Sequence, residues 1–377
     1  METSVTSLES FTGGGALAVD FTAIEKELAG LWKSASTAPD GSATPAVTRA
    51  CQLNLVVCCR GEEQAALANK TIREITKIRP SRVLLAVVEP HLEQERLTAS
   101  ISAHCALAPS AGRGKQVCCE QVTIHASAGA ARRLPATILP LLLPDLPVVG
   151  WWPGDPALSE EVNRKLIEIC DRVIVDSRCF ADPLGRFRQM AAPGPPCSDI
   201  AWHRLRGWRE LAAGLFDGPV FEEYPSRMES IRVIYAGHDQ DVTPPGRGPM
   251  AGEAILLASW VASRLNWSPQ RSMRSIGFER QVFGEHRGSG APGQVLSLTL
   301  AAPDASFTLR RTGLADCVTA TVSIPGTCPV PRTVRVVERD EPALLCRVLE
   351  RTGFDAVHDQ ALRLAAALLT PDEVSPT

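Results

Sequence analysis

Apolar side chains in the first half of the chain alternate between short runs and helical spacing. Residues 82–88 form a nearly continuous apolar run, which is typical of a strand covered on both faces. Residues 50–59 are also mostly apolar, and residues 62–78 between these segments repeat apolar positions every three to four residues. The pattern therefore predicts a strand, a helix and a second strand in succession.

The same alternation continues as far as a proline-rich segment, residues 191–198. It predicts strands at 97–107, 116–125, 147–150 and 172–176, and helices at 130–139 and 156–169. A loop that contains glycine joins the first two of these strands as a hairpin. The resulting order, β-α-β-β-β-α-β-α-β, indicates a mixed sheet covered by helices.

A second set of elements follows the proline-rich segment, which is typical of a domain boundary. Asp199 is placed to cap a helix that runs to Phe216. Further strands are predicted near 230–236, 275–283, 294–301, 306–311 and 317–324, and helices near 251–266, 342–351 and 357–369.

These patterns predict an α/β (α+β) fold with two domains, each a mixed β-sheet covered by helices. Residues 48–190 are expected to form the N-terminal domain and residues 199–370 the C-terminal domain. Residues 1–47 are expected to be a flexible tail, because their start is rich in Ser, Thr and Gly. One amphipathic helix interrupts the tail, with Ile24 and Leu28 on its apolar face.

Length, charge and cysteine usage narrow the class of protein. A chain of 377 residues suits two domains, and a net charge of −3 gives no broad basic surface for nucleic acid. No apolar run reaches the roughly 18 residues of a membrane span, and the start does not resemble a signal peptide. Twelve cysteines without a C-x-x-C pair suit a reducing compartment. We therefore expect a cytoplasmic protein that binds neither nucleic acid nor membranes.

The stretch LLLPDLPVVGWWPGD, residues 141–155, is the most distinctive in the chain. Its three prolines confine it to a short buried strand with a sharp exit. Trp151 and Trp152 stand at this exit, where adjacent side chains point to opposite faces. One indole is expected to pack inward and the other to face a groove or a partner. The alternative is that both are core or rim aromatics.

Catalytic motifs do not stand out in the sequence. The string AGRGK at 111–115 lacks the spacing of a phosphate-binding loop. No G-x-G-x-x-G stands between a predicted strand and a predicted helix, and no G-x-S-x-G is present. His104 and His125 lie on adjacent predicted strands and could approach each other, although a satisfied sheet histidine is the commoner case. His238 and Asp239 follow a predicted strand, as an active-site pair or as a polar turn. We expect no catalytic residue, metal or cofactor.

The cysteines suggest packing for some positions and redox chemistry for others. In the adjacent pairs at 58–59 and 118–119, each thiol points to a different face, which disfavours one shared metal and favours packing over redox sensing. Cys170, Cys179 and Cys197 lie near the predicted domain boundary and are expected to be more accessible. They are the redox candidates, with thioredoxin as a candidate partner.

Several stretches resemble the OpcA-type glucose-6-phosphate dehydrogenase assembly proteins of bacteria. They are TIREITKIRPSRVLLAV at 71–87, LLLPDLPVVGWWPGDP at 141–156, SDIAWHRLRGWRELAAGLFD at 198–217 and AILLASWVASRLNW at 254–267. The second and third are distinctive, and together the four stretches span both predicted domains.

The resemblance implies a protein without catalysis of its own. Members of this family are thought to bind glucose-6-phosphate dehydrogenase, promote its active oligomer and raise its activity, which feeds the oxidative pentose phosphate pathway and the NADPH supply. Trp and Arg are favoured anchors of protein interfaces. The resemblance therefore implies that the distinctive stretches contact the partner protein. The candidate partner-binding residues are Trp151, Trp152, Pro153, Gly154, Asp155 and Arg209.

Two other functions stay open at this point. The chain could be an enzyme acting on a phosphorylated sugar, with His238 and Asp239 or a cleft at a strand end as the site. It could also be a regulatory protein that senses a metabolite, in which the mixed sheet binds the ligand and reports to a partner.

Overall fold

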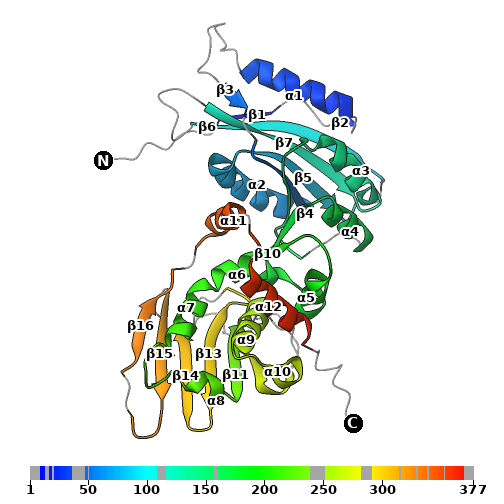
Figure 1. Cartoon of the computed structure of the whole chain (residues 1–377). Coiled ribbons are helices and arrows are strands. Elements are labelled where there is room, and N and C mark those ends of the chain that lie inside the picture. The colour runs from blue at the N-terminus through cyan, green and yellow to red at the C-terminus, as the bar shows by residue number, and fades with distance from the viewer. Residues whose placement is uncertain are drawn as a thin grey trace, which may run out of the picture. The chain divides into compact units, whose positions relative to one another are not determined.

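A computed structural model of the protein describes most of the chain. The described residues are 9–12, 17–18, 21–35, 47–49, 51–92, 94–107, 116–155, 160–237, 251–281, 291–313, 316–327, 330–337, 339–351 and 353–368. The chain divides into two compact units (Figure 1). Unit 1 is Met1–Val175, Gly194–Ser198 and Glu341–Thr352, and unit 2 is Asp176–Pro193, Asp199–Asp340 and Gly353–Thr377.

Unit 1 is built on a mixed sheet. Its strands are β1 (Glu9–Thr12), β2 (Leu17–Ala18), β3 (Val47–Arg49), β4 (Leu53–Arg60), β5 (Ser81–Glu89), β6 (Leu97–Leu107), β7 (Gln116–Ser127), β8 (Val148–Trp152), β9 (Arg172–Val175) and β10 (Cys197–Asp199). The order across the sheet is β1-β6-β7-β5-β4-β8-β9-β10, with β2 paired to β6 and β3 to β7.

The central strands of this sheet are parallel. β4 pairs with β5 on one side and β8 on the other, β5 pairs with β7, and β8 pairs with β9. In chain order the parallel strands therefore run 3-2-1-4-5, as in doubly wound sheets. The chain changes direction across the sheet between β4 and β8, and the carboxyl ends of these two strands mark the switch point where such sheets place ligands.

Helices cover the parallel strands, and the strands are buried accordingly. The helices of unit 1 are α1 (Phe21–Ala35), α2 (Gly61–Ile78), α3 (Leu134–Ile138), α4 (Glu160–Glu168) and α11 (Glu341–Glu350). α2 packs on β4 and β5, and α11 packs on α2. All residues of 53–59 and 81–88 are buried, so the predicted burial of β5 on both faces is confirmed.

A buried ion pair ties α1 to the sheet. The helix predicted near residue 24 is α1, whose Ile24 and Leu28 are buried. The Arg82 guanidinium on β5 pairs with Glu120 on β7 and, at 3.2 Å, with Glu25 on α1. The Arg82 and Glu120 side chains are 3% and 0% exposed, so Arg82 compensates the charge of Glu120 away from water.

Unit 2 is built on a second mixed sheet, of order β12-β11-β13-β14-β15-β16. Its strands are β11 (Ser230–Ala236), β12 (Ile276–Gln281), β13 (Val295–Ala302), β14 (Ala305–Arg311), β15 (Cys317–Ser323) and β16 (Arg332–Arg335). β11 and β12 are parallel, and the other pairs are antiparallel. The fold class of two α/β domains with mixed sheets and helices is therefore confirmed.

Some helices of unit 2 pack on this sheet and others pack on those helices. They are α5 (Pro183–Ala191), α6 (Ile200–Arg204), α7 (Arg206–Gly214), α8 (Tyr224–Arg227), α9 (Gly252–Arg264), α10 (Pro269–Ser275) and α12 (Ala356–Ala366). α9 packs on β11, α7 packs on β14, and α12 packs on α9 and α5. On the covered face Phe307 contacts the rings of Phe216, Phe221 and Tyr224.

The structure contains elements that the sequence pattern did not predict. α5 begins after Asp182, whose carboxylate accepts a hydrogen bond from Gly185 N at 3.1 Å. β16 is a short edge strand with little apolar signal. The single helix expected between Asp199 and Phe216 breaks at Leu205 into α6 and α7. The predicted domain limits, 48–190 and 199–370, stay predictions.

We expect Arg82→Met to lower the free energy of unfolding by about 3–5 kcal/mol, because Glu120 would be left charged and buried. Urea titration of the full chain measures this. Arg132→Met removes an arginine that is 74% exposed and pairs with Glu95, and it should cost about 1 kcal/mol or less. Adding Glu120→Leu to Arg82→Met should recover most of the loss, and equal losses for Arg82→Met and Arg132→Met would contradict the argument.

Candidate functional site

The distinctive tryptophans lie at the carboxyl end of β8, and both are buried. Trp151 is 0% exposed and Trp152 is 2% exposed. Trp152 Nε1 donates to Asn163 Oδ1 on α4 at 3.2 Å, whereas Trp151 Nε1 is buried without a hydrogen-bond partner. The interpretation of both tryptophans as core aromatics is therefore confirmed and that of one outward-facing indole is wrong, because a central parallel strand is covered on both of its faces.

The side chain of Gln64 lies between the end of β4 and the turn after β8. Gln64 Oε1 accepts a hydrogen bond from Arg60 N at 2.6 Å, at the start of α2. On its other side, Gln64 Nε2 overlaps the place that a Cβ at Gly154 would take, so a larger residue at Gly154 would displace the end of the Gln64 side chain. Pro153 and Asp155 flank this glycine and are half-buried. A glutamine side chain thus lies at the switch point of unit 1.

The charges at the start of α2 are unfavourable for an anionic ligand. The first turn carries Glu62 and Glu63, and Glu62 Oε1 lies 2.9 Å from His125 Nδ1. Carboxylates compete with phosphate for the partial positive charge of a helix start. A turn that binds a pyrophosphate would instead have no carboxylates next to its backbone N–H groups.

The predicted approach of His104 to His125 is wrong. In the β6–β7 register His104 is opposite Cys119, six residues before His125 on β7, which places the two histidines about 20 Å apart at the usual rise of a strand. Burial, with Arg73 second, lowers the pKa of His104. His238, Asp239 and the AGRGK string lie outside the described residues.

Arg209 lies in unit 2 and stacks on Trp202. The guanidinium carbon is 3.3 Å from the centroid of the Trp202 ring, a cation–π contact within one helical region. Trp202 Nε1 donates to Asp355 at 3.1 Å, and its ring also contacts His358. Burial lowers the pKa of His358 to about 4. Arg209 is half-buried in this cluster, so much of its surface is already used within unit 2.

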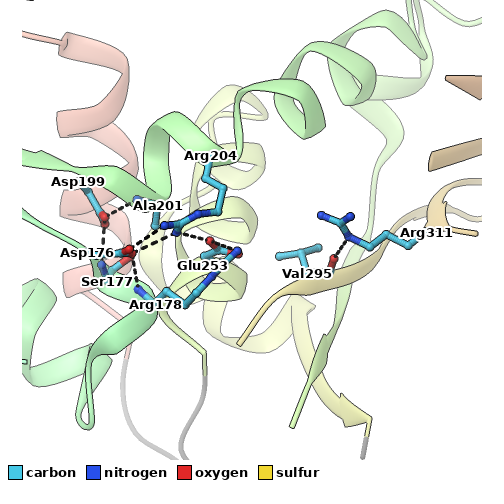
Figure 2. Close-up of polar contacts among 9 residues, drawn as sticks. All are labelled: Asp176, Ser177, Arg178, Asp199, Ala201, Arg204, Glu253, Val295 and Arg311. Carbon is cyan, nitrogen blue, oxygen red and sulfur yellow. Dashed lines mark hydrogen bonds and ion pairs between the residues drawn. The ribbon is translucent and has the colours of Figure 1, made fainter. Parts of the chain in front are cut away.

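A network of buried charges forms the polar centre of unit 2 (Figure 2). The Arg204 guanidinium, 9% exposed, lies 2.7 Å from Asp176 and 2.7 Å from Glu253, which also pairs with Arg178 at 2.7 Å. Burial alone would lower the pKa of Arg204, but these carboxylates raise it above its ordinary value. Arg204 is therefore held as a cation in the interior.

Asp199 joins this network as a buried acid. Its Oδ1 accepts hydrogen bonds from Ser177 N at 3.0 Å and Ala201 N at 2.9 Å, so the predicted helix cap is confirmed (Figure 2). Oδ2 is buried without a hydrogen-bond partner. Burial first, and the negative charge of Asp176 second, raise the pKa of Asp199 to about 7, although the N–H donors act in the opposite direction.

The three cysteines predicted to be accessible differ in their exposure. Cys179 is exposed and Cys197 is half-buried. Cys170 is buried and its Sγ donates to Leu166 O at 3.1 Å, so the prediction of access is wrong there. Burial also raises the pKa of Cys170 to about 12, which removes the thiolate needed for reaction at neutral pH.

The adjacent cysteines are packing residues on both faces of the sheet. Cys58, Cys59 and Cys119 are buried, and burial raises the pKa of Cys59 and of Cys119 to about 12. Cys118 is buried too and is disulfide-bonded. Within the described part of the chain, no three His, Cys, Asp or Glu side chains are grouped to hold a metal ion. Of the helices described, none has the length and apolarity that a membrane crossing needs.

The fold and these sites define a protein of two α/β units in which a doubly wound sheet carries a glutamine side chain at its switch point. The chain belongs to the OpcA glucose-6-phosphate dehydrogenase assembly family. Residues 72–192 match the glucose-6-phosphate dehydrogenase subunit N-terminal domain, and residues 195–362 match the C-terminal domain of that subunit.

Curated relatives carry the same family name. The chain is 30% identical over 308 residues to the OxPP cycle protein OpcA of Synechococcus elongatus, covering 74% of this chain and 66% of the relative. It is 28% identical over 327 residues to the protein of the same name from Nostoc punctiforme, covering 78% and 66%. The alignments thus span slightly less than two thirds of the length of these relatives.

Solved structures show only weak likeness. An oxidoreductase from Bacillus subtilis aligns with a TM-score of 0.44 and 10% identity over 83% of this chain and 95% of that one. An aldose-aldose oxidoreductase from Caulobacter crescentus aligns with a TM-score of 0.37 and 8% identity over 84% and 96%. Likeness at this level carries no argument about activity.

Asp199→Asn should change how stability depends on pH. An unfolded Asp ionises near pH 4 and the folded Asp199 near pH 7, so between these values the folded state holds the extra proton and wild-type stability falls as pH rises. Asn copies the protonated form. Urea titration gives the free energy of unfolding of wild type minus that of Asp199→Asn. This difference should fall by about 2–3 kcal/mol from pH 5 to pH 7.

Asp304→Asn is the matched control, since its side chain is 45% exposed on the surface of the same unit. Its difference from wild type should change by less than about 0.5 kcal/mol over the same range. A flat difference for Asp199→Asn would contradict the assignment of a buried acid that gains its proton in the folded state.

Proposed function

We propose that this protein is a non-enzymatic assembly factor that binds glucose-6-phosphate dehydrogenase in the cytoplasm. By binding the active conformation or oligomer more tightly than the inactive one, it shifts the population toward the active form. The result is allosteric activation and a greater supply of NADPH from the oxidative pentose phosphate pathway. The observation that carries the proposal is the match of residues 72–192 and 195–362, in order, to the N-terminal and C-terminal domains of one family.

The switch point of unit 1 supports a role without catalysis. A doubly wound sheet that binds a cofactor needs space and N–H donors between the first and fourth parallel strands. In this protein the Gln64 side chain contacts both the end of β4 and the turn after β8, and Glu62 and Glu63 stand at the helix start. These features favour a binding protein over an enzyme acting on a phosphorylated sugar.

The proposed contact with the dehydrogenase includes the turn after β8. Trp151 and Trp152 stabilise this turn from the interior, so the partner would touch Pro153 and Asp155, the half-buried members of the turn. Proline gives the turn few accessible conformations, which lowers the entropy lost on binding. Arg209 is the corresponding candidate in unit 2.

The direct test titrates cognate glucose-6-phosphate dehydrogenase with this protein while activity and mass by light scattering are followed. A saturable rise in activity together with a heavier complex is expected. Asp155→Lys should weaken the complex about tenfold or more, because it reverses a charge at the contact. Glu168→Lys, on α4 and 57% exposed, is the matched control and should leave binding within about twofold.

The proposal is wrong if no complex forms and activity does not rise. Turnover of a phosphorylated sugar by the purified chain alone would establish the enzyme instead. A melting shift caused by a metabolite in the absence of the dehydrogenase would support a sensor.

Redox control is a separate layer of the proposal. Cys179 is exposed and is the best placed of the three candidate thiols to react with thioredoxin or another dithiol reductant. Activation should differ between oxidised and dithiol-reduced protein, and Cys179→Ser should abolish that difference while Cys170→Ser keeps it. Equal activation by both forms of the wild-type protein would remove the redox layer and leave the assembly role intact.

A further inference from the structure

The sheet of unit 2 has one face that its helices leave open. The strand register places Arg232, Thr299, Thr308 and Thr321 in one row across the sheet. Arg232 and Thr321 are exposed, and the two threonines between them are half-buried. Residues on the opposite face, such as Val233 and Phe307, are buried beneath the helices. The open face is thus the polar side of a mostly antiparallel sheet.

Hydroxyl groups dominate this open face. Thr299 and Thr308 pair through their Oγ1 atoms at 3.2 Å, and Thr319 and Thr333 pair in the same way at 2.9 Å. β-branched side chains have restricted χ1 angles, so this surface loses little side-chain entropy when it is covered. The hydroxyl side chains of this face are therefore already ordered.

Positive charge crosses the same face on three strands. Arg232 on β11, Arg310 on β14 and Arg335 on β16 are exposed and occupy open-face positions in the register. On the described strands, one acidic residue occupies an open-face position, and it is Glu279 on β12. A chain with a net charge of −3 thus presents three cations and one anion on this sheet face.

We propose that the open face of the β11–β16 sheet binds an acidic protein surface. At the usual strand spacing the six strands span about 24 Å and each strand about 20 Å, an area that is roughly half of one partner's share of a standard interface. Opposite charge on the partner would steer the encounter, and the hydroxyls would supply hydrogen bonds without a large entropy cost. A second copy of the chain is disfavoured, because two such faces would bring their arginines together.

The identity of the acidic partner rests on the proposed function. Under that proposal, the partner is glucose-6-phosphate dehydrogenase. The open face would then be a second contact, in addition to the turn after β8. The proposal itself concerns only the chemistry of the surface, and it can be tested with a simple acidic polypeptide.

The test compares Arg232→Glu/Arg310→Glu with wild type for binding to the dehydrogenase and to fluorescent poly-glutamate. Both ligands should bind the double variant at least about tenfold more weakly, and wild-type binding should weaken as salt is raised. Arg206→Glu/Arg363→Glu is the matched control, since these arginines are 58% and 70% exposed on helices of the same unit. The control should stay within about twofold, and circular dichroism should show both variants folded.

Each outcome decides between the two proposals. If wild type binds the dehydrogenase and the open-face variant binds it equally well, the open-face proposal is wrong and the proposed function stands. If wild type binds poly-glutamate through this face and never the dehydrogenase, the proposed function is wrong and the surface chemistry stands. Binding of neither ligand overturns both, and a wild-type dimer that the variant loses identifies a second copy as the occupant.

Discussion

Unit 2 depends on a single requirement, that the charge of Arg204 be compensated away from water. The compensation comes from Asp176, which follows β9, and from Glu253 in the first turn of α9, residues far apart in the chain. For Glu253 to reach Arg204, α9 must begin against the carbonyl of Ser177, where a Cβ at Gly252 would overlap the backbone. One ion network therefore fixes both the point where the chain enters unit 2 and the position of α9, which packs on β11.

Periodicity along the chain was sufficient to predict the elements that are buried uniformly. Continuous apolar runs become β4 and β5, and helical spacing becomes α1, α2 and α9, because these signals depend on neighbours within a few residues. The mixed sheets could be predicted for the same reason. α5 could have been found too, since Asp182 and Pro183 form a helix start by residue type alone.

The site was harder to predict because its contacts are distant in sequence. Gln64 has no unusual spacing, and only the pairing of β4 with β8 brings it against Gly154. The register of β6 and β7 separates His104 from His125, which no local pattern reveals. The alternation of side chains along a strand suggested one outward-facing indole, yet both are buried and Asn163 on α4 accepts a hydrogen bond from Trp152 Nε1. Burial of polar groups follows from tertiary partners, and a sequence records these only indirectly.

The short strands before α1 have a consequence for the solubility of unit 1. β6 is 11 residues long, and β1 and β2 pair with its outer side at residues 102–105 and 98–99. A long strand edge without such partners is a template on which other chains can add strands and aggregate. The opening segments thus shield the sheet, so the beginning of the chain protects the folded protein from self-association that the core alone does not prevent.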